Sequence, residues 1–167
     1  MMAIRALETP AAPWTAERSA VARGDSLGRF GCALVLRFGF MESVLDVGAG
    51  SGRLVNVLAR ACGSYVGIDQ TANDGVLVAD AHELPFPDQH FDIVASKQTL
   101  PHFRDPAKAL AEMMRVARRG VVIQQEFPEG GVGWEGHSVV HYDEPGDVLA
   151  LLPGATFDGL DFVWRRP

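Results

Sequence analysis

The chain has 167 residues, enough for one domain, 1–167, that buries roughly two-thirds of its unfolded surface. With 47% hydrophobic and 22% charged residues the composition is that of a globular protein, and the net charge of −6 argues against a nucleic-acid partner. No apolar run is long enough for a membrane span, and Cys32 and Cys62 are too few for a disulfide framework, so we expect a cytoplasmic protein with reduced cysteines and no membrane partner.

The N-terminal part of the sequence predicts an arm and then a helix. Residues 1–22 are rich in Ala and Pro, which argues against a long helix there. From Asp25 onward, apolar residues recur at helical spacing, and Gly39 ends the pattern. This stripe, which we expect to pack on a sheet, consists of Leu27, Phe30, Leu34 and Phe38.

The most informative stretch is 44–53, which predicts a buried strand, a tight turn and the start of a helix. Apolar residues surround Asp46, as is typical of a strand in the middle of a parallel sheet. Gly48, Gly50 and Gly52 follow at every second position. Glycines there permit a sharp turn and a close approach of a ligand to the main chain, where the N–H groups of the helix start face it.

The spacing of the glycines excludes other ligand-binding loops. A dinucleotide fingerprint would need its third glycine at Arg53, and a phosphate-binding P-loop would need a Gly-Lys-Ser/Thr ending. A nucleophile elbow around Ser51 would need glycines at Ala49 and Arg53. Because Asp46 precedes the loop by two residues, its carboxylate suits a ligand with an ammonium or sulfonium charge.

Two further strands are predicted at 65–69 and 76–78, with only six residues between them. Asp69 ends the first of these, at the side of a doubly wound sheet where ligands bind, and its carboxylate suits the two hydroxyls of a ribose. Parallel strands normally need a longer crossover, but six extended residues span about 20 Å and return along a strand of about 17 Å. An antiparallel hairpin through Asn73-Asp74-Gly75 is the alternative.

The remaining sequence continues the alternation of strands and helices. Asp105 and Pro106 are typical of a helix start, and the three arginines at 115, 118 and 119 are expected at the solvated end of that helix. His82 and His90 are expected in surface turns. The predicted elements are strand 91–96, helix 107–118, strand 120–125, a glycine-rich loop 128–136 around Trp134, helix 147–152 and one final strand 155–165.

In combination, these motifs resemble class I S-adenosylmethionine (SAM) dependent methyltransferases over roughly residues 42–126. Residues 84–94 resemble the small-molecule branch, methyltransferase type 11. The resemblance implies an α/β, doubly wound, mostly parallel Rossmann-like sheet of about six strands, here without the usual helix between the second and third strands and one strand short of the family's C-terminal hairpin. Because residues 79–86 are similar to the family's third motif, we favour the parallel return for 76–78.

The resemblance also implies site residues. Asp69 would bind the ribose hydroxyls, Asp80 would accept a hydrogen bond from the adenine amino group, and the Ala81 amide would contact a ring nitrogen. The residues assigned to the cofactor are Asp46, Gly48, Ala49, Gly50, Gly52, Asp69, Gln70, Asp80, Ala81 and Lys97. In the family an N-terminal segment covers the cofactor as a lid, so Trp14 is either part of such a lid or of a packed arm.

A catalytic base is needed only where the acceptor is a hydroxyl or an acidic carbon. His102 is the first candidate, because the family commonly has a histidine there, although Pro101 replaces the histidine often found before it. Further candidates by position are Glu126, His137 and His141. No metal site is predicted, because the sequence between the last two histidines favours extended chain.

The sequence therefore predicts transfer of the SAM methyl group to a small molecule, with S-adenosylhomocysteine (SAH) as product. The alternative is a methyltransferase-like protein that binds SAM or SAH without turnover, or that serves as a partner subunit. A nicotinamide-dependent oxidoreductase is disfavoured by Arg53 at the third-glycine position. The missing helix also predicts an exposed apolar edge at 76–78, covered either by the arm around Trp14 or by a second subunit in a homodimer.

Overall fold

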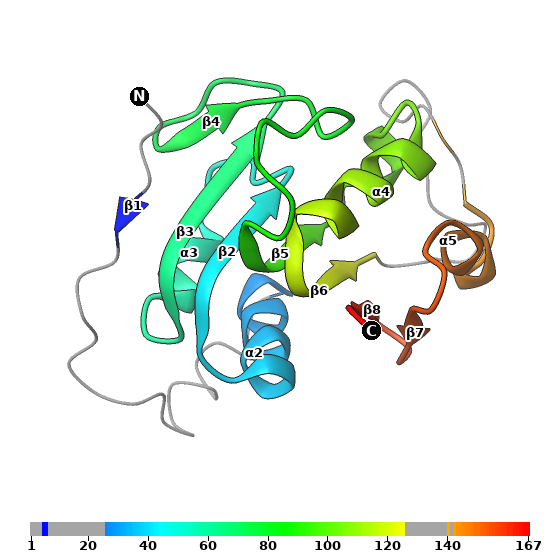
Figure 1. Cartoon of the computed structure of the whole chain (residues 1–167), viewed down its shortest axis with the longest axis horizontal. Helices are drawn as coiled ribbons and strands as arrows, with labels where there is room; N and C mark the ends of the chain where they lie inside the picture. Colours follow the sequence, from blue (N-terminus) through cyan, green and yellow to red (C-terminus); the bar gives the residue numbers. More distant parts are fainter. Residues whose placement is uncertain (1–4, 7–25, 126–139, 141) are drawn as a thin grey trace.

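The computed structural model describes residues 5–6, 26–125, 140 and 142–167. In these residues one mixed sheet of eight strands carries helices on both faces (Figure 1). The elements in chain order are β1 (Arg5–Ala6), α2 (Ser26–Phe38), β2 (Met41–Val47), α3 (Leu54–Leu58), β3 (Cys62–Asp69), β4 (Val76–Val78), β5 (Phe91–Lys97), the 3₁₀ helix η1 (Leu100–His102), α4 (Pro106–Val116), β6 (Ala117–Gln124), α5 (Pro145–Leu151), β7 (Thr156–Phe157) and β8 (Asp161–Arg165).

The strand order is β1-β3-β2-β5-β6-β8-β7, with β4 paired to β3. The central strands β3, β2, β5 and β6 are parallel, and β1, β8 and β7 are antiparallel additions at the edges. This confirms the mostly parallel, doubly wound sheet. The count exceeds the expected six because β1 and β7, of two residues each, had not been predicted as separate strands.

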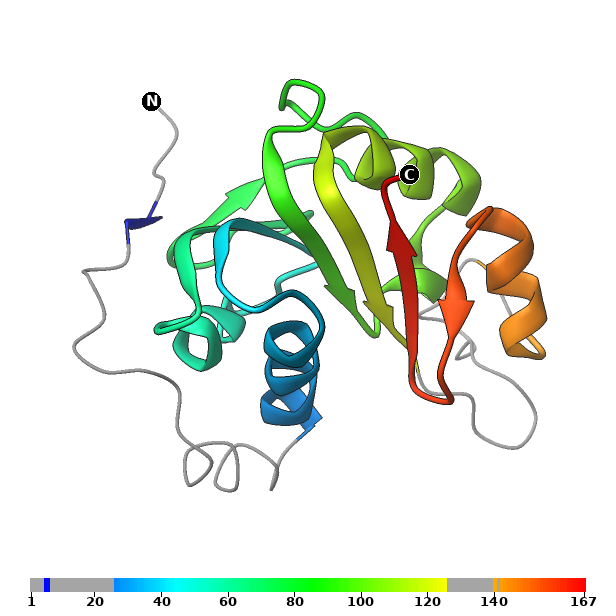
Figure 2. The ribbon, with the colours of Figure 1, turned by 60° about the horizontal axis from the view of Figure 1, so that its bottom comes forward.

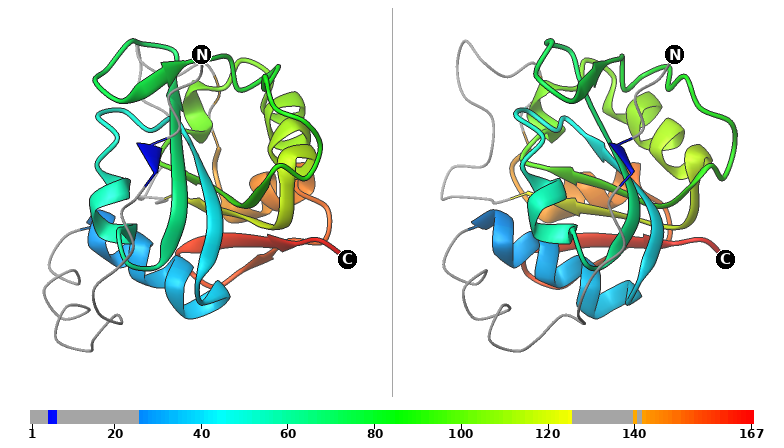
Figure 3. Two further views of the ribbon diagram at one scale, coloured as in Figure 1. Left: turned by 60° about the vertical axis from the view of Figure 1, so that its left-hand side comes forward. Right: turned by 90° about the vertical axis from the view of Figure 1, so that its left-hand side faces the viewer.

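The short connection after β3 returns as predicted. Strand β4 pairs with β3 in parallel, with Gly67 opposite Val76 and Asp69 opposite Val78. Residues 70–75 contain no helix, which confirms that the usual crossover helix is missing. Val78 is 64% exposed, as expected for an uncovered edge. Strand β1 pairs with the earlier residues of β3, on the side that also carries β4 (Figure 3). Trp14 lies outside the described residues.

The prediction of one final strand over 155–165 is wrong. The chain turns at Asp158-Gly159, and β7 and β8 form the antiparallel hairpin that the family usually has (Figure 2). The carboxylate of Asp158 accepts hydrogen bonds from the backbone N–H groups of Leu160 and Asp161, and Gly159 takes a φ of +98°. An Asp-Gly pair is a turn signal that separates two short strands.

Side chains of the central strands alternate between two cores. Val44, Ile93 and Val122 face α2 and α3, whereas Leu45 and Val94 face α4 and α5. Figure 3 shows α2 and α3 on one side of the sheet and α4 on the other. This two-layer cover requires strands that are apolar on both faces, which is why the predicted strands read as continuous apolar runs.

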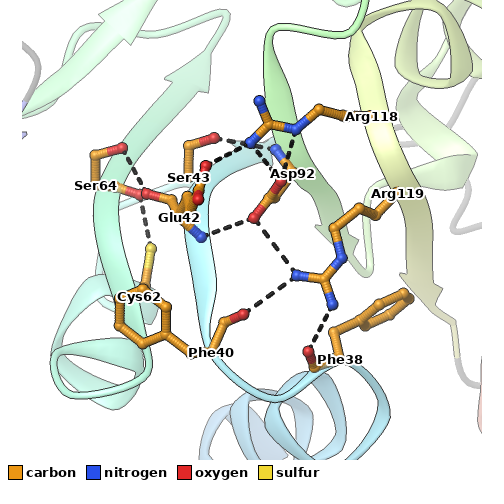
Figure 4. A network of polar contacts seen from close by, with 9 residues as sticks. All are labelled: Phe38, Phe40, Glu42, Ser43, Cys62, Ser64, Asp92, Arg118 and Arg119. Carbon is orange, nitrogen blue, oxygen red and sulfur yellow. Dashed lines mark hydrogen bonds and ion pairs between the residues drawn. The ribbon is translucent and has the colours of Figure 1, made fainter.

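The expectation that the arginines after α4 form a solvated helix end is also wrong. The helix ends at Val116 and β6 begins at Ala117, so Arg118 and Arg119 lie on a strand. Both guanidinium groups contact the carboxylate of Asp92, at 2.6 Å for Arg118 and 3.5 Å for Arg119 (Figure 4). Arg115, which does lie in the last turn, binds Glu112 in the same helix.

Asp92, at the start of β5, is the centre of this network and only 3% exposed. It also accepts the backbone N–H of Glu42, and Arg119 donates to the carbonyl groups of Phe38 and Phe40 (Figure 4). Desolvation alone would raise the pKa of Asp92, but the hydrogen bonds from Glu42 and Arg118 outweigh it and hold the pKa below 3.8. The network therefore joins β2, β5, β6 and the end of α2.

We predict that Asp92→Ala lowers the free energy of unfolding by about 2–3 kcal/mol at pH 7, because several hydrogen bonds to a charged group are lost. The matched control Asp88→Ala removes a 74% exposed partner of Arg115 and is expected to change stability by less than about 1 kcal/mol. Urea unfolding measures both. Since the pKa of Asp92 is lowered, its contribution is present above pH 3.8 and disappears as the pH falls below that value. Equal effects of the two substitutions at pH 7 would contradict this role.

Candidate functional site

Two adjoining cavities lie at the carboxyl ends of β2, β3 and β5. The first, of about 310 Å³, is lined from the predicted set by Gly48, Asp69, Gln70, Ala81, Lys97 and His102. The second, of about 190 Å³, is lined from that set by Asp46, Gly48, Ala49, Gly50 and Lys97. Gly48 and Lys97 line both, so the two cavities meet at these residues. Of the predicted cofactor residues, Gly52 and Asp80 line neither.

The glycine loop is fixed to the end of β3. Its amides at Gly48 and Ala49 both donate to the carbonyl of Ile68 at 2.9 Å, and Gly50 donates to the carboxylate of Asp69 at 2.9 Å. Gly48 has a φ of +75°, and a Cβ there would lie 2.4 Å from the side chain of Thr99. Close packing against Thr99 therefore requires glycine at this position, and the three amides are hydrogen-bonded within the protein.

Asp69 has the position that the sequence predicted for it. Its second carboxylate oxygen accepts the backbone N–H and the hydroxyl of Thr71, both at 3.1 Å. Desolvation would raise the pKa of Asp69, but the hydrogen bonds from Thr71 and Gly50 hold it below 3.8. The side chain is therefore an ionised acceptor, oriented by the loop on one side and by the turn after β3 on the other.

Asp46 is a buried carboxylate at the second cavity, and only 4% of it is exposed. The hydroxyl of Tyr65 donates to it at 2.6 Å. Desolvation raises the pKa of Asp46 to about 6, the hydrogen bond from Tyr65 opposes this, and the nearby charge of Asp69 adds to it. A buried acid of this kind favours a cation as its neighbour.

The two neighbours of Asp80 form part of the first cavity's wall. Ala79 and Ala81 line the cavity, whereas the carboxylate of Asp80 accepts hydrogen bonds from His82 and lies 3.3 Å from a nitrogen of Arg104. The prediction that His82 lies in a surface turn is wrong, since it is 6% exposed. The local sequence could not predict the burial of His82, because its second hydrogen-bond partner, the backbone of Asp105, is distant in sequence.

His102, the candidate base, is an exposed residue of η1 that lines the first cavity. The other candidate bases, Glu126, His137 and His141, lie outside the described residues, as does Trp134. Over the part of the chain that the structure describes, no group of three or more His, Cys, Asp or Glu residues could hold a metal ion. In the same part, no helix has the length and apolar character needed to cross a membrane.

The pattern of residues around these cavities corresponds to a known family. Residues 45–123 match the family model described as a methyltransferase domain, of the type 11 branch.

Over these residues the chain is similar to methyltransferases.

Curated proteins similar to this part of the chain include the ubiquinone/menaquinone biosynthesis C-methyltransferases UbiE of Burkholderia mallei and Burkholderia thailandensis. Each is 38% identical over 95 residues, which is 46% of this chain and 39% of the relative. The chain thus matches less than half the length of these relatives.

Solved structures share the fold over most of the chain. The 1,6-didemethyltoxoflavin-N1-methyltransferase of Burkholderia thailandensis, solved with 1,6-didemethyltoxoflavin and SAH bound, has a TM-score of 0.68 and 18% identity over 98% of this chain and 94% of that chain. A SAM-dependent methyltransferase from Aquifex aeolicus has a TM-score of 0.56 and 21% identity over 87% of this chain and 95% of that chain. At these identities the likeness is one of fold.

The sequence did not predict several residues that line the two cavities. Thr71 orients Asp69, and a threonine two residues after an aspartate is a turn pattern that could have indicated it. Leu27 of α2, expected only in the core, lines the second cavity. Thr99 and Phe103 line the first cavity from the segment after β5, and nothing in their local spacing predicted this.

We predict that Asp46→Asn stabilises the protein at pH 8 by roughly 2–3 kcal/mol, because the variant avoids burying an ionised carboxylate. The pKa is raised in the folded state, so the stability that Asp46 contributes is fully present below about pH 4 and is lost as the pH rises to about 6. The advantage of the variant should therefore vanish near pH 4. Urea unfolding at both pH values, with Asp74→Asn in an exposed turn as control, measures this. A wild type that is the more stable protein at pH 8 would refute it.

Proposed function

We propose that this protein transfers the methyl group of SAM to a small-molecule acceptor and releases SAH. The observation that carries the proposal is the pair of cavities that meet at Gly48, with Asp46 beside one and Asp69 beside the other. A ligand with a ribose at one end and an amino acid at the other could place its ribose hydroxyls at Asp69 and its ammonium group at Asp46. The domain family and its relatives support the same reaction.

The residues fit this ligand by shape and by charge. Gly48 lines both cavities, and its positive φ and the neighbouring Thr99 side chain leave no room for a larger residue at this junction. The buried carboxylate of Asp46 suits the ammonium group of the methionine part. Asp69, ionised and oriented, suits the two ribose hydroxyls. We propose Asp80 and Ala81 for the adenine ring, and of these two Ala81 lines the first cavity.

In the proposed reaction the side chains bind and orient SAM and the acceptor, because a sulfonium is by itself a good leaving group. Holding the acceptor atom in line with the methyl group therefore supplies much of the acceleration. His102 lines the first cavity, and we propose it as the base where the acceptor must lose a proton. The remaining proposed cofactor residues, Gln70 and Lys97, lie at the ends of β3 and β5.

A small-molecule acceptor is supported by the names of the relatives. One group acts in ubiquinone/menaquinone biosynthesis, and the structural neighbour from Burkholderia thailandensis binds 1,6-didemethyltoxoflavin.

We further propose a cytoplasmic location. We also propose that a second copy of the chain covers the exposed edge at Val78 in a homodimer, which light scattering measures.

Binding of SAM or SAH without turnover is the second candidate function. The missing helix after β3 favours binding without turnover, because the short segment 70–75 borders the first cavity where related enzymes have a helix. The C-terminal hairpin, whose expected loss also favoured it, is present. Release of SAH in the presence of candidate acceptors separates the two functions.

The first test is the choice of ligand. Titration calorimetry is expected to show binding of SAM and SAH and no binding of NAD, because the glycine loop lacks the third glycine of a dinucleotide site. Binding of NAD without binding of SAM would overturn the proposed function.

The second test concerns the ribose contact. Asp69→Ala is expected to weaken SAH binding by roughly 1.5–3 kcal/mol, about tenfold or more, because the hydroxyls lose their acceptor and the loop loses its tie at Gly50. Thr71→Val leaves the carboxylate in place and is expected to have a smaller effect, and Asp74→Ala none. If Asp69→Ala changes the affinity by less than twofold while the fold is intact, Asp69 is only a turn residue.

A further inference from the structure

His82 is buried between two segments that both line the first cavity. Its Nδ1 lies 2.5 Å from a carboxylate oxygen of Asp80, and its Nε2 accepts the backbone N–H of Asp105 at 3.1 Å. Both nitrogens of the ring are therefore engaged, one on each segment. Neither the sequence motif nor the proposed reaction assigns a role to this side chain.

The partners of His82 determine where its proton resides. The backbone nitrogen of Asp105 is only a donor, so Nε2 must accept and carries no proton. The proton is then on Nδ1, from which it is donated to the carboxylate of Asp80. The ring is thus neutral and in one tautomer. A doubly protonated ring would place an Nε2–H against the N–H of Asp105 and break that contact.

The two segments that His82 joins both contribute to the wall of the first cavity. Asp80 stands between Ala79 and Ala81, which line the first cavity. Asp105 caps the start of α4 and directly follows the segment that contains His102 and Phe103, which also line the first cavity. The ring of Phe103 packs edge-on against His82, with 6.0 Å between the centroids.

The charged groups around His82 reinforce this arrangement. Hydrogen bonds from the His82 backbone and ring hold the pKa of Asp80 below 3.8, with a smaller effect of Arg104. Arg104 contacts the other oxygen of that carboxylate, at 3.3 Å. The carboxylate of Asp105 accepts the backbone N–H of Lys108 at the start of α4 and so lies on the helix side. His82 is the link between these two carboxylate-bearing segments.

We propose that His82 is a positioning residue that holds the adenine side of the first cavity to the η1 segment beside the acceptor. Through one neutral imidazole it orients Asp80 and fixes the start of α4 at Asp105. The effect on ligand binding rests on the proposed function, whereas the state of the imidazole rests on the geometry alone.

The tautomer is tested in the wild-type protein. Nuclear magnetic resonance of histidine labelled with ¹³C and ¹⁵N, with the His82 signal assigned by its loss in His82→Gln, is expected to show a neutral ring protonated on Nδ1 at pH 7.5. Protonation on Nε2 would overturn the proposal. This result does not depend on whether the protein binds SAH.

Two conservative variants separate the two contacts. His82→Asn keeps a donor at the place of Nδ1 and loses the acceptor for Asp105, whereas His82→Gln keeps an acceptor at the place of Nε2 and loses the donor to Asp80. His82→Leu loses both and keeps an apolar side chain against Phe103. The exposed His90, which stacks on Phe86, provides the control His90→Leu.

Two measurements report on the two contacts of His82, one on the contact with Asp80 and one on the contact with Asp105. The affinity for SAH, measured by calorimetry, is expected to fall about threefold or more in His82→Gln and about tenfold in His82→Leu, and to stay within about twofold in His82→Asn and His90→Leu. Protection of the Asp105 amide from hydrogen exchange is expected to be lost in His82→Asn and His82→Leu and kept in His82→Gln.

The outcomes distinguish this inference from the proposed function. If the wild type binds no SAH, the proposed function fails, and the tautomer and the Asp105 amide still decide the state of His82. If the wild type binds SAH and all three His82 variants bind it equally well, His82 is only a packed core residue and the proposal is wrong.

Discussion

The site depends on the attachment of the glycine loop to the end of β3. One carbonyl, that of Ile68, accepts the amides of Gly48 and Ala49, and the carboxylate of Asp69 accepts the amide of Gly50. Since β2 and β3 are parallel neighbours, their carboxyl ends meet, and the loop that leaves β2 can be held by β3. Without this attachment, neither cavity would have its shared wall at Gly48.

The opposite end of the sheet is held by a second polar network, around Asp92. It joins the starts of β5 and β6 to β2 and to the end of α2, so that the strands keep their register (Figure 4). The two ends of the sheet differ in how the charge of their buried carboxylate is compensated. Asp92 is compensated by two arginines of the protein, whereas Asp46 at the site end accepts a hydrogen bond from the Tyr65 hydroxyl and has a raised pKa. A buried acid with a raised pKa beside a cavity is typical of a binding site.

Much of the candidate site could be predicted from sequence because its residues lie at fixed distances from strand ends. Asp46, Asp69, Gly48 and Gly50 are all placed by the alternation of strand, turn and helix, and the structure brings them to two adjoining cavities. His82 could not be predicted, because its second partner, Asp105, is 23 residues away and a hydrogen bond between them exists only when β4 and α4 are in place. The arginines after α4 were misplaced for the same reason, since their partner Asp92 belongs to another strand.

The sequence by itself determined the order of the elements, the parallel sheet and the missing crossover helix, because periodicity, glycine spacing and segment length are local properties of the chain. The tertiary structure alone decided where Arg118, Arg119 and His82 find their partners, and that the C-terminal segment folds into a hairpin against β6. These contacts follow from which strands become neighbours. That order is set by packing of the whole sheet between two helical layers, which no local pattern contains.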